Sequence, residues 1–89
     1  MFSIRLSNKA EKQYRELEPE MALRVDGLFK ALEEKPVPAT EFKLKKLAGT
    51  ENEYRVRLSS HRVLYQVYWQ EQVIRVSKIE RKSDHTYKR

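Results

Sequence analysis

The 89-residue sequence contains no cysteine, and it has only two glycines and three prolines. The absence of cysteine excludes a disulfide framework and a thiolate metal site. Because no Pro-, Gly- or Ser-rich stretch is long enough to act as a linker, we expect a single domain over residues 1–89. The apolar stretches are only a few residues long, and the N-terminal segment lacks the apolar core of a signal peptide. We therefore expect a cytoplasmic protein without a membrane segment.

Positive charge is concentrated in the second half of the chain, although the whole sequence has a formal net charge of only +6. Residues 1–40 hold 7 Lys/Arg and 7 Asp/Glu, whereas residues 41–89 hold 12 and 6. A one-sided positive field of this kind attracts polyanions such as RNA. An ordinary solvated basic surface would explain the charge alone equally well.

The first part of the chain predicts one strand and two helices. Residues 2–7 alternate between apolar and polar side chains, which is typical of a half-buried strand. Ser7 or Asn8 can cap a first helix that ends just before Pro19. Pro19 suits the first turn of a second helix, which Pro36 ends. Apolar residues recur in this second helix at three- and four-residue spacing, so the two helices are expected to form an amphipathic hairpin.

The second part changes to a period of two. Residues 42–47 suggest a short extended or irregular piece, followed by a turn. Three strands are then expected over residues 54–58, 62–69 and 73–79, and the short turns between them imply an antiparallel meander. The predicted fold class is therefore α+β, in the order β-α-α-β-β-β. The helical hairpin should pack on one face of the antiparallel sheet and leave the other face open.

The open face is where we expect a cluster of arginines. The apolar residues of the strand 54–58 share one face, so Arg55 and Arg57 share the opposite one. If the apolar set packs under the helices, the two guanidinium groups project about 7 Å apart, close to the phosphate repeat of an extended RNA strand. Arg62 begins the next strand and Arg81 follows the last one. We therefore expect these four arginines to line one concave surface.

Three of these arginines also have an explanation that involves no function. Arg55 and Arg57 would each pass as an ordinary exposed cation of a strand. Arg62 can pair across strands with Glu53 or Glu80, an interaction worth little at a surface. The presence of all the arginines together favours the functional interpretation.

Three segments form a specific combination. They are Tyr54-Arg-Val-Arg-Leu58, His61-Arg-Val-Leu-Tyr-Gln-Val67, and Arg81 followed after five residues by Tyr87. Together with the helical hairpin they resemble the RelE family of toxins, part of the RelE/ParE superfamily of type II toxin–antitoxin systems, over nearly the whole chain. The segments Pro36-Val-Pro38 and Lys46-Leu-Ala-Gly49 look closest to archaeal-type members.

The resemblance implies a metal-independent endoribonuclease that cuts mRNA in the ribosomal A site and inhibits translation. The 2′-hydroxyl attacks its own 3′-phosphate, which requires in-line placement, charge stabilisation, a base and an acid. No cofactor is implied. By position, the resemblance implies Arg55 and Arg57 as a basic pair, Arg62 as the phosphate-stabilising arginine, Arg81 as a basic residue near the leaving group, and Tyr87 as a residue that stacks on a base or assists proton transfer.

One departure from the family concerns the base. Well-known members carry lysine at the positions of Arg55 and Arg57, and a lysine among cations can give up its proton, whereas arginine stays protonated. We therefore assign both arginines to phosphate binding and charge stabilisation. The general base stays open among His61, His85, Tyr87 and a group of the ribosome or the RNA. The two histidines lie far apart without a carboxylate cluster, so they give no metal signature.

Further basic residues are expected to bind RNA phosphates, and a solvated basic surface is the alternative for them. These residues are Lys43, Lys45, Lys46, Lys82 and His85.

The resemblance also implies partners: a RelB-like cognate antitoxin, the 70S ribosome and the mRNA in its A site. Two other functions remain open for the same fold. One is a ParE-like inhibitor of DNA gyrase, and the other is a catalytically inactive module that binds RNA or protein. ParE-like members lack the full set of arginines and tyrosine, so its presence here favours the RNase.

Overall fold

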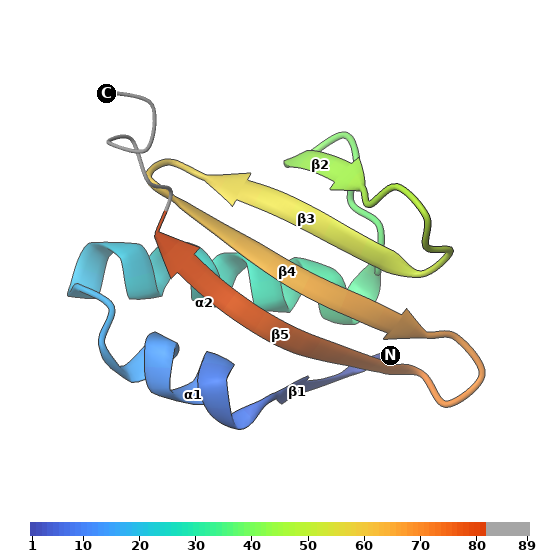
Figure 1. Cartoon of the computed structure of the whole chain (residues 1–89), viewed down its shortest axis with the longest axis horizontal. Helices are drawn as coiled ribbons and strands as arrows, with labels where there is room; N and C mark the ends of the chain where they lie inside the picture. The colour runs from blue at the N-terminus through green and yellow to red at the C-terminus, as the bar shows by residue number, and fades with distance from the viewer. Residues whose placement is uncertain (82–89) are drawn as a thin grey trace.

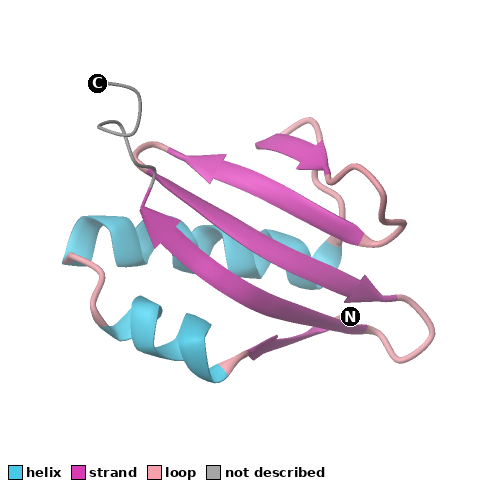
Figure 2. Cartoon of the chain, viewed as in Figure 1, coloured by secondary structure: helices cyan, strands magenta, loops and turns pink. Residues whose placement is uncertain are grey.

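The computed structural model describes residues 1–81, which form a five-stranded sheet with two helices on one side of it (Figure 1). Figure 2 distinguishes the helices, strands and connecting loops. The predicted α+β class and the helical pair on one face are confirmed. Within residues 1–81, neither helix is long and apolar enough to cross a membrane. The elements are β1 (Ser3–Leu6), α1 (Asn8–Arg15), α2 (Pro19–Glu34), β2 (Lys43–Lys46), β3 (Glu53–Leu58), β4 (His61–Tyr68) and β5 (Val73–Arg81).

The order of the strands in the sheet is β1-β5-β4-β3-β2. The predicted meander is confirmed for β3, β4 and β5. The short extended or irregular piece expected at 42–47 is the edge strand β2, which pairs with β3 in the antiparallel direction. The predicted antiparallel sheet needs one correction, because β1 pairs with β5 in parallel. Helices α1 and α2 connect β1 at one edge of the sheet to β2 at the opposite edge. The following strands then run back across the sheet, so that the last strand, β5, lies beside β1.

The helices begin where capping chemistry favours it. The Oγ of Ser7 accepts a hydrogen bond from the backbone N–H of Ala10 at 3.0 Å, which satisfies one of the free donors in the first turn of α1. This helix ends at Arg15, earlier than the sequence suggested, and a short connection leads to α2. Pro19 is the first residue of α2 because its missing N–H costs nothing there.

The core lies between the helices and the sheet. Tyr65 is its largest fully buried side chain, and its hydroxyl donates to the carbonyl oxygen of Pro36 at 2.8 Å. Burial raises the pKa of Tyr65 well above its ordinary value, so the hydroxyl remains a donor. The buried apolar side chains are Ala10, Val25, Leu28, Leu32, Val56, Leu58, Val63, Tyr65, Val67, Ile74, Val76 and Ile79.

A β-bulge interrupts the pairing of β4 with β5. Leu64 pairs with Lys78 and Tyr65 with Val76, so Ser77 has no partner residue on β4. The Oγ of Ser77 donates to the carbonyl of Leu64 at 3.2 Å. Because one residue is inserted, every side chain of β5 after Ser77 changes face.

Candidate functional site

The face of the sheet that the helices leave open carries two rows of mainly basic side chains. Residues paired directly across strands project from the same face. The neighbours of these residues along β3 and β4, such as Val56 and Val63, are fully buried under the helices, so both rows lie on the open face. The first row is Lys43, Arg57, Arg62 and Glu80, and the second is Lys45, Arg55, Leu64 and Lys78.

Four of these cations surround a shallow hollow between β2 and β3. Lys43, Lys45, Arg55 and Arg57 line it together with Leu44, and its volume is about 260 Å³. Within residues 1–81, none of the four belongs to an ion pair. Like charges on neighbouring strands repel one another, so an anion bound in the hollow would relieve this repulsion.

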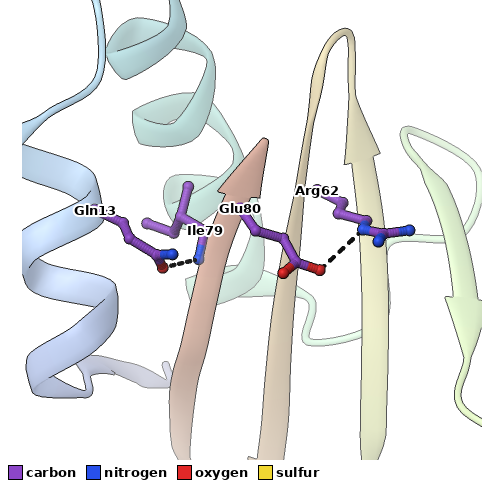
Figure 3. A network of polar contacts seen from close by, with 4 residues as sticks. All are labelled: Gln13, Arg62, Ile79 and Glu80. Carbon is purple, nitrogen blue, oxygen red and sulfur yellow. Dashed lines mark hydrogen bonds and ion pairs between the residues drawn. The ribbon is translucent and has the colours of Figure 1, made fainter. Parts of the chain in front are cut away.

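Within residues 1–81, Arg62 differs from the other arginines of the open face because it has an acidic partner. Its Nε donates to Oε2 of Glu80 at 2.9 Å, and the two side chains are 34% and 30% exposed. Figure 3 shows the pair, with the rest of the guanidinium pointing away from Glu80 and over β3. One edge of the guanidinium is therefore held while its terminal nitrogens can approach a phosphate.

The strand that carries Glu80 is itself held in place by α1. Strand β1 ends at Leu6, which is paired with Val76, so no strand of the described part of the chain pairs with the last part of β5 on that side. Gln13 of α1 takes the place of a strand, because its Oε1 accepts from the backbone N–H of Ile79 at 2.7 Å (Figure 3). A buried donor is thereby satisfied next to the residue that pairs with Arg62.

Arg81 lies on the other side of the sheet, so the prediction that it shares a surface with the other three arginines is wrong. It pairs with His61, whose neighbour Arg62 faces the opposite way. The cause is the bulge at Ser77, which moves Arg81 from the open face to the face of the helices. Arg81 and His61 line a separate pocket of about 340 Å³ with Glu16, Leu17, Glu18, Glu20, Met21, Arg24, Ser59 and Ser60.

His61 has an environment that favours its neutral form. Burial and then the charge of Arg81 lower the pKa of His61 below its ordinary value. Its Nδ1 lies 3.1 Å from the Oγ of Ser60. A neutral imidazole can accept a proton, but this one lies on the face opposite Arg62.

The remaining predicted residues divide into two groups. Lys43 and Lys45 lie on the open face with the arginines. Lys46 is paired with Tyr54 and so belongs to the opposite face, at the edge strand. The predictions for Lys82, His85 and Tyr87 lie outside the described residues.

Sequence reasoning missed three cations of the open face. Lys78 belongs to the second row, and a third row runs from Gln66 through Arg75 to Arg5. Arg5 and Arg75 each stand between apolar residues of an alternating strand, and that alternation was a sufficient signal for both. Lys78 could not be assigned in this way, because the bulge precedes it. Within residues 1–81, no group of three or more His, Asp and Glu side chains is arranged to hold a metal ion.

Comparison with known proteins identifies the family. The model of the family described as ParE toxin of type II toxin–antitoxin system, parDE, matches residues 4–85. The chain belongs to the RelE/ParE family of toxins. A relative named toxin RelE1, from Methanocaldococcus jannaschii, is 31% identical over 81 residues, which cover 91% of this chain and 90% of the relative.

Solved RelE structures share the fold of this family member. The archaeal RelE–RelB complex from Pyrococcus horikoshii OT3 contains a chain with a TM-score of 0.83 and 30% identity, over 92% of this chain and 96% of that one. The isolated E. coli RelE toxin matches with a TM-score of 0.82 at 22% identity, over 94% of this chain and 87% of that one. At this identity the similarity is evidence for the fold and not for the function. The resemblance predicted from the sequence is confirmed, including its leaning toward archaeal RelE.

Proposed function

We propose that this RelE-like toxin is a ribosome-dependent endoribonuclease that cuts mRNA in the A site and so inhibits translation in the cytoplasm. The observation that carries the proposal is the grouping of Arg55, Arg57 and Arg62 with Lys43 and Lys45 on one open face. The cations of β2 and β3, which have no acidic partners among residues 1–81, fit the phosphates of a single RNA strand.

In the proposed reaction the 2′-hydroxyl attacks the adjacent phosphorus. The bond from phosphorus to O2′ forms while the bond to O5′ breaks, leaving a 2′,3′-cyclic phosphate and a 5′-hydroxyl end. Negative charge builds up on the phosphoryl oxygens, where guanidinium forks bind well. Arg62 is assigned to this position because Glu80 fixes its Nε edge, and Arg55 and Arg57 hold the flanking phosphates.

Proton transfer requires groups other than these arginines. Arginine stays protonated at any usable pH, and His61 faces the other side of the sheet. We therefore assign the base and the acid to His85, Tyr87 or groups of the ribosome and the RNA. The role of Arg81 near the leaving group stays a prediction. Arg81 is paired with His61 on the face opposite Arg62, so its position supports this role less than the positions of Arg55, Arg57 and Arg62 support theirs.

A ParE-like action on DNA gyrase is the second candidate. The observation that favours it is the description of the matching family model, which names ParE. The cluster around Arg62 supports the RNase instead, since a gyrase inhibitor has no need to stabilise charge on a phosphoryl group.

We also propose a RelB-like antitoxin as the cognate partner. The RelE proteins of P. horikoshii and M. jannaschii were both solved as complexes with RelB. The helical pair and the exposed edge strand β2 offer a docking surface, and acidic side chains of the antitoxin would match the net charge of +6.

Toeprinting of programmed 70S ribosomes tests the proposed cleavage. Wild type should cut the A-site codon, whereas Arg62→Ala should lose most cleavage because charge stabilisation in the transition state contributes about two to three orders of magnitude in rate. Lys30→Ala, a change of the same charge on the exposed side of α2, is the matched control and should cut normally. Naked mRNA should remain intact.

The outcomes separate the candidates. An intact message with wild-type protein, together with inhibition of gyrase supercoiling, would support the ParE-like action. Binding to ribosomes without cleavage would indicate an inactive module. If Arg62→Ala cut at the wild-type rate, the open face would not be the active site.

A further inference from the structure

Two arginines from distant parts of the sequence stand side by side on the open face. Arg5 of β1 is paired with Arg75 of β5, and both side chains are exposed. Their strands are neighbours about 4.8 Å apart. On the other side of Arg75 the row continues with Gln66, which carries no charge.

This pair has no acidic counterpart within residues 1–81. Neither Arg5, Arg75 nor Lys78 takes part in an ion pair there. Glu53 belongs to the same row but stands on β3, two strands from Arg75, with Gln66 between them. Like charges directly opposite each other destabilise a sheet. An anion bound from outside the described fold would therefore relieve the repulsion between Arg5 and Arg75.

We propose that Arg5, Arg75 and Lys78 form a second RNA site, which binds backbone phosphates away from the point of cleavage. The row of Arg75 and Arg5 lies two rows from that of Arg62, about 13 Å along the strands, and Lys78 lies in the row between them. That distance corresponds to two nucleotides of an extended strand. Arg5 lies a further strand away from the hollow between β2 and β3, so the second site widens the binding face instead of duplicating the first.

The identity of the ligand as RNA rests on the proposed function, and two sources of RNA fit the chemistry. One is the message on either side of the cut, and the other is the ribosomal RNA that surrounds the A site. Both present phosphodiester groups to exposed guanidinium forks. Ribosomes without mRNA and a short single-stranded oligonucleotide distinguish the two sources.

The test compares a double variant with a control of equal charge. Arg5→Gln/Arg75→Gln removes two charges from the second site, and Lys12→Gln/Lys30→Gln removes two from the exposed helices. Affinity is measured by fluorescence anisotropy for both RNA probes over a range of salt. Two phosphate contacts contribute a slope of about 1.4 in a plot of log affinity against log salt. Between about 50 and 200 mM salt, wild type should lose about sevenfold more affinity than the double variant.

The control should keep the wild-type slope with both probes. A reduced slope of the double variant with empty ribosomes assigns the site to ribosomal RNA, and a reduced slope only with the oligonucleotide assigns it to the message. Wild-type slopes with both probes would overturn the inference. Because binding is measured without cleavage, a wild type that binds through Arg5 and Arg75 but cuts nothing would remove the proposed function and leave the second site.

A third variant guards against a loss of folding. Arg75→Glu converts the repelling pair into an attracting one, so its melting temperature should equal or exceed that of wild type. Its affinity for RNA should fall at least as far as that of the double variant. A protein that folds stably and still binds RNA with wild-type affinity would contradict the second site.

Discussion

Replacing Glu80 by glutamine should weaken the fold slightly and strengthen the binding of RNA. Glutamine keeps an oxygen that can accept from Nε of Arg62, so the orientation of the guanidinium is retained, but the negative charge is removed. In wild type this charge opposes the approach of a phosphate to the same arginine. Stability and affinity are therefore expected to change in opposite directions.

The two magnitudes follow from the geometry. The hydrogen bond from Nε to Glu80 is 2.9 Å long. A phosphate bound by the terminal nitrogens of Arg62 lies on the far side of the guanidinium from Glu80. The two hydrogen bonds and the width of the guanidinium together separate the carboxylate from the phosphate by about 7 Å. At the dielectric constant of water their repulsion is about 0.6 kcal/mol, or about threefold in Kd. The ion pair itself is roughly one-third exposed, so its loss should cost only about 0.5 kcal/mol of unfolding free energy.

The assay is anisotropy of an RNA oligonucleotide whose 2′-hydroxyls are methylated, so that attack on phosphorus is blocked. It is run at about 50 mM salt, where screening is weak. Glu34→Gln is the matched control, because it removes the same charge from the exposed end of α2 and should leave Kd unchanged. A Kd for Glu80→Gln equal to or weaker than that of wild type would refute the reasoning, since it would show that the carboxylate helps Arg62 bind more than it repels the ligand.

Three further changes test the environment of the site. Tyr65→Phe removes the hydroxyl that donates to the carbonyl of Pro36, so urea unfolding should show a loss of about 1–2 kcal/mol, whereas the exposed Tyr68→Phe should stay within about 0.5 kcal/mol. The pKa of His61 is lowered in the folded state, chiefly by burial, so wild type should lose stability as pH falls below the ordinary histidine value of about 6.5. Melting curves on both sides of that pH should show a smaller loss for His61→Gln, and an equal loss would contradict the assignment. Gln13→Leu removes the acceptor of the Ile79 amide, so hydrogen exchange at that amide should accelerate and stability should fall by about 1–3 kcal/mol.

Much of the fold could be predicted because a half-buried strand and an amphipathic helix leave direct marks in a sequence. The alternation over 54–58 predicted a strand with Val56 inside and Arg55 and Arg57 outside, as found. The parallel pairing of β1 with β5 could not be predicted in this way. Alternation shows which face of a strand is buried, but it does not show the strand's direction or its neighbour.

The same limit explains the site. Arg55, Arg57 and Arg62 were placed correctly because β3 pairs with β4 without a register shift, so the faces follow directly from the positions of the residues along the strands. Arg81 was placed wrongly because the bulge at Ser77 reverses which face of the sheet the later residues of β5 project from. A serine in a strand does not by itself indicate a bulge. In the structure, the Oγ of Ser77 donates to the carbonyl of Leu64, and the carbonyl of Ser77 accepts from the Oγ of Ser7, which lies 70 residues away in the sequence.

The bulge also gives the open face its chemical character. Without it, Ile79 would project from the open face and Glu80 would point toward the helices, where a carboxylate without a partner would be costly to bury. With it, Ile79 enters the core and Glu80 reaches Arg62. On the open face Arg62 therefore has an acidic partner, whereas Arg55 and Arg57 have none within the described residues. In the proposed function, Arg62 is held at its Nε to stabilise charge in the reaction, whereas Arg55 and Arg57 are free to bind the flanking phosphates. The bulge in β5 makes this difference possible because it places Glu80 beside Arg62.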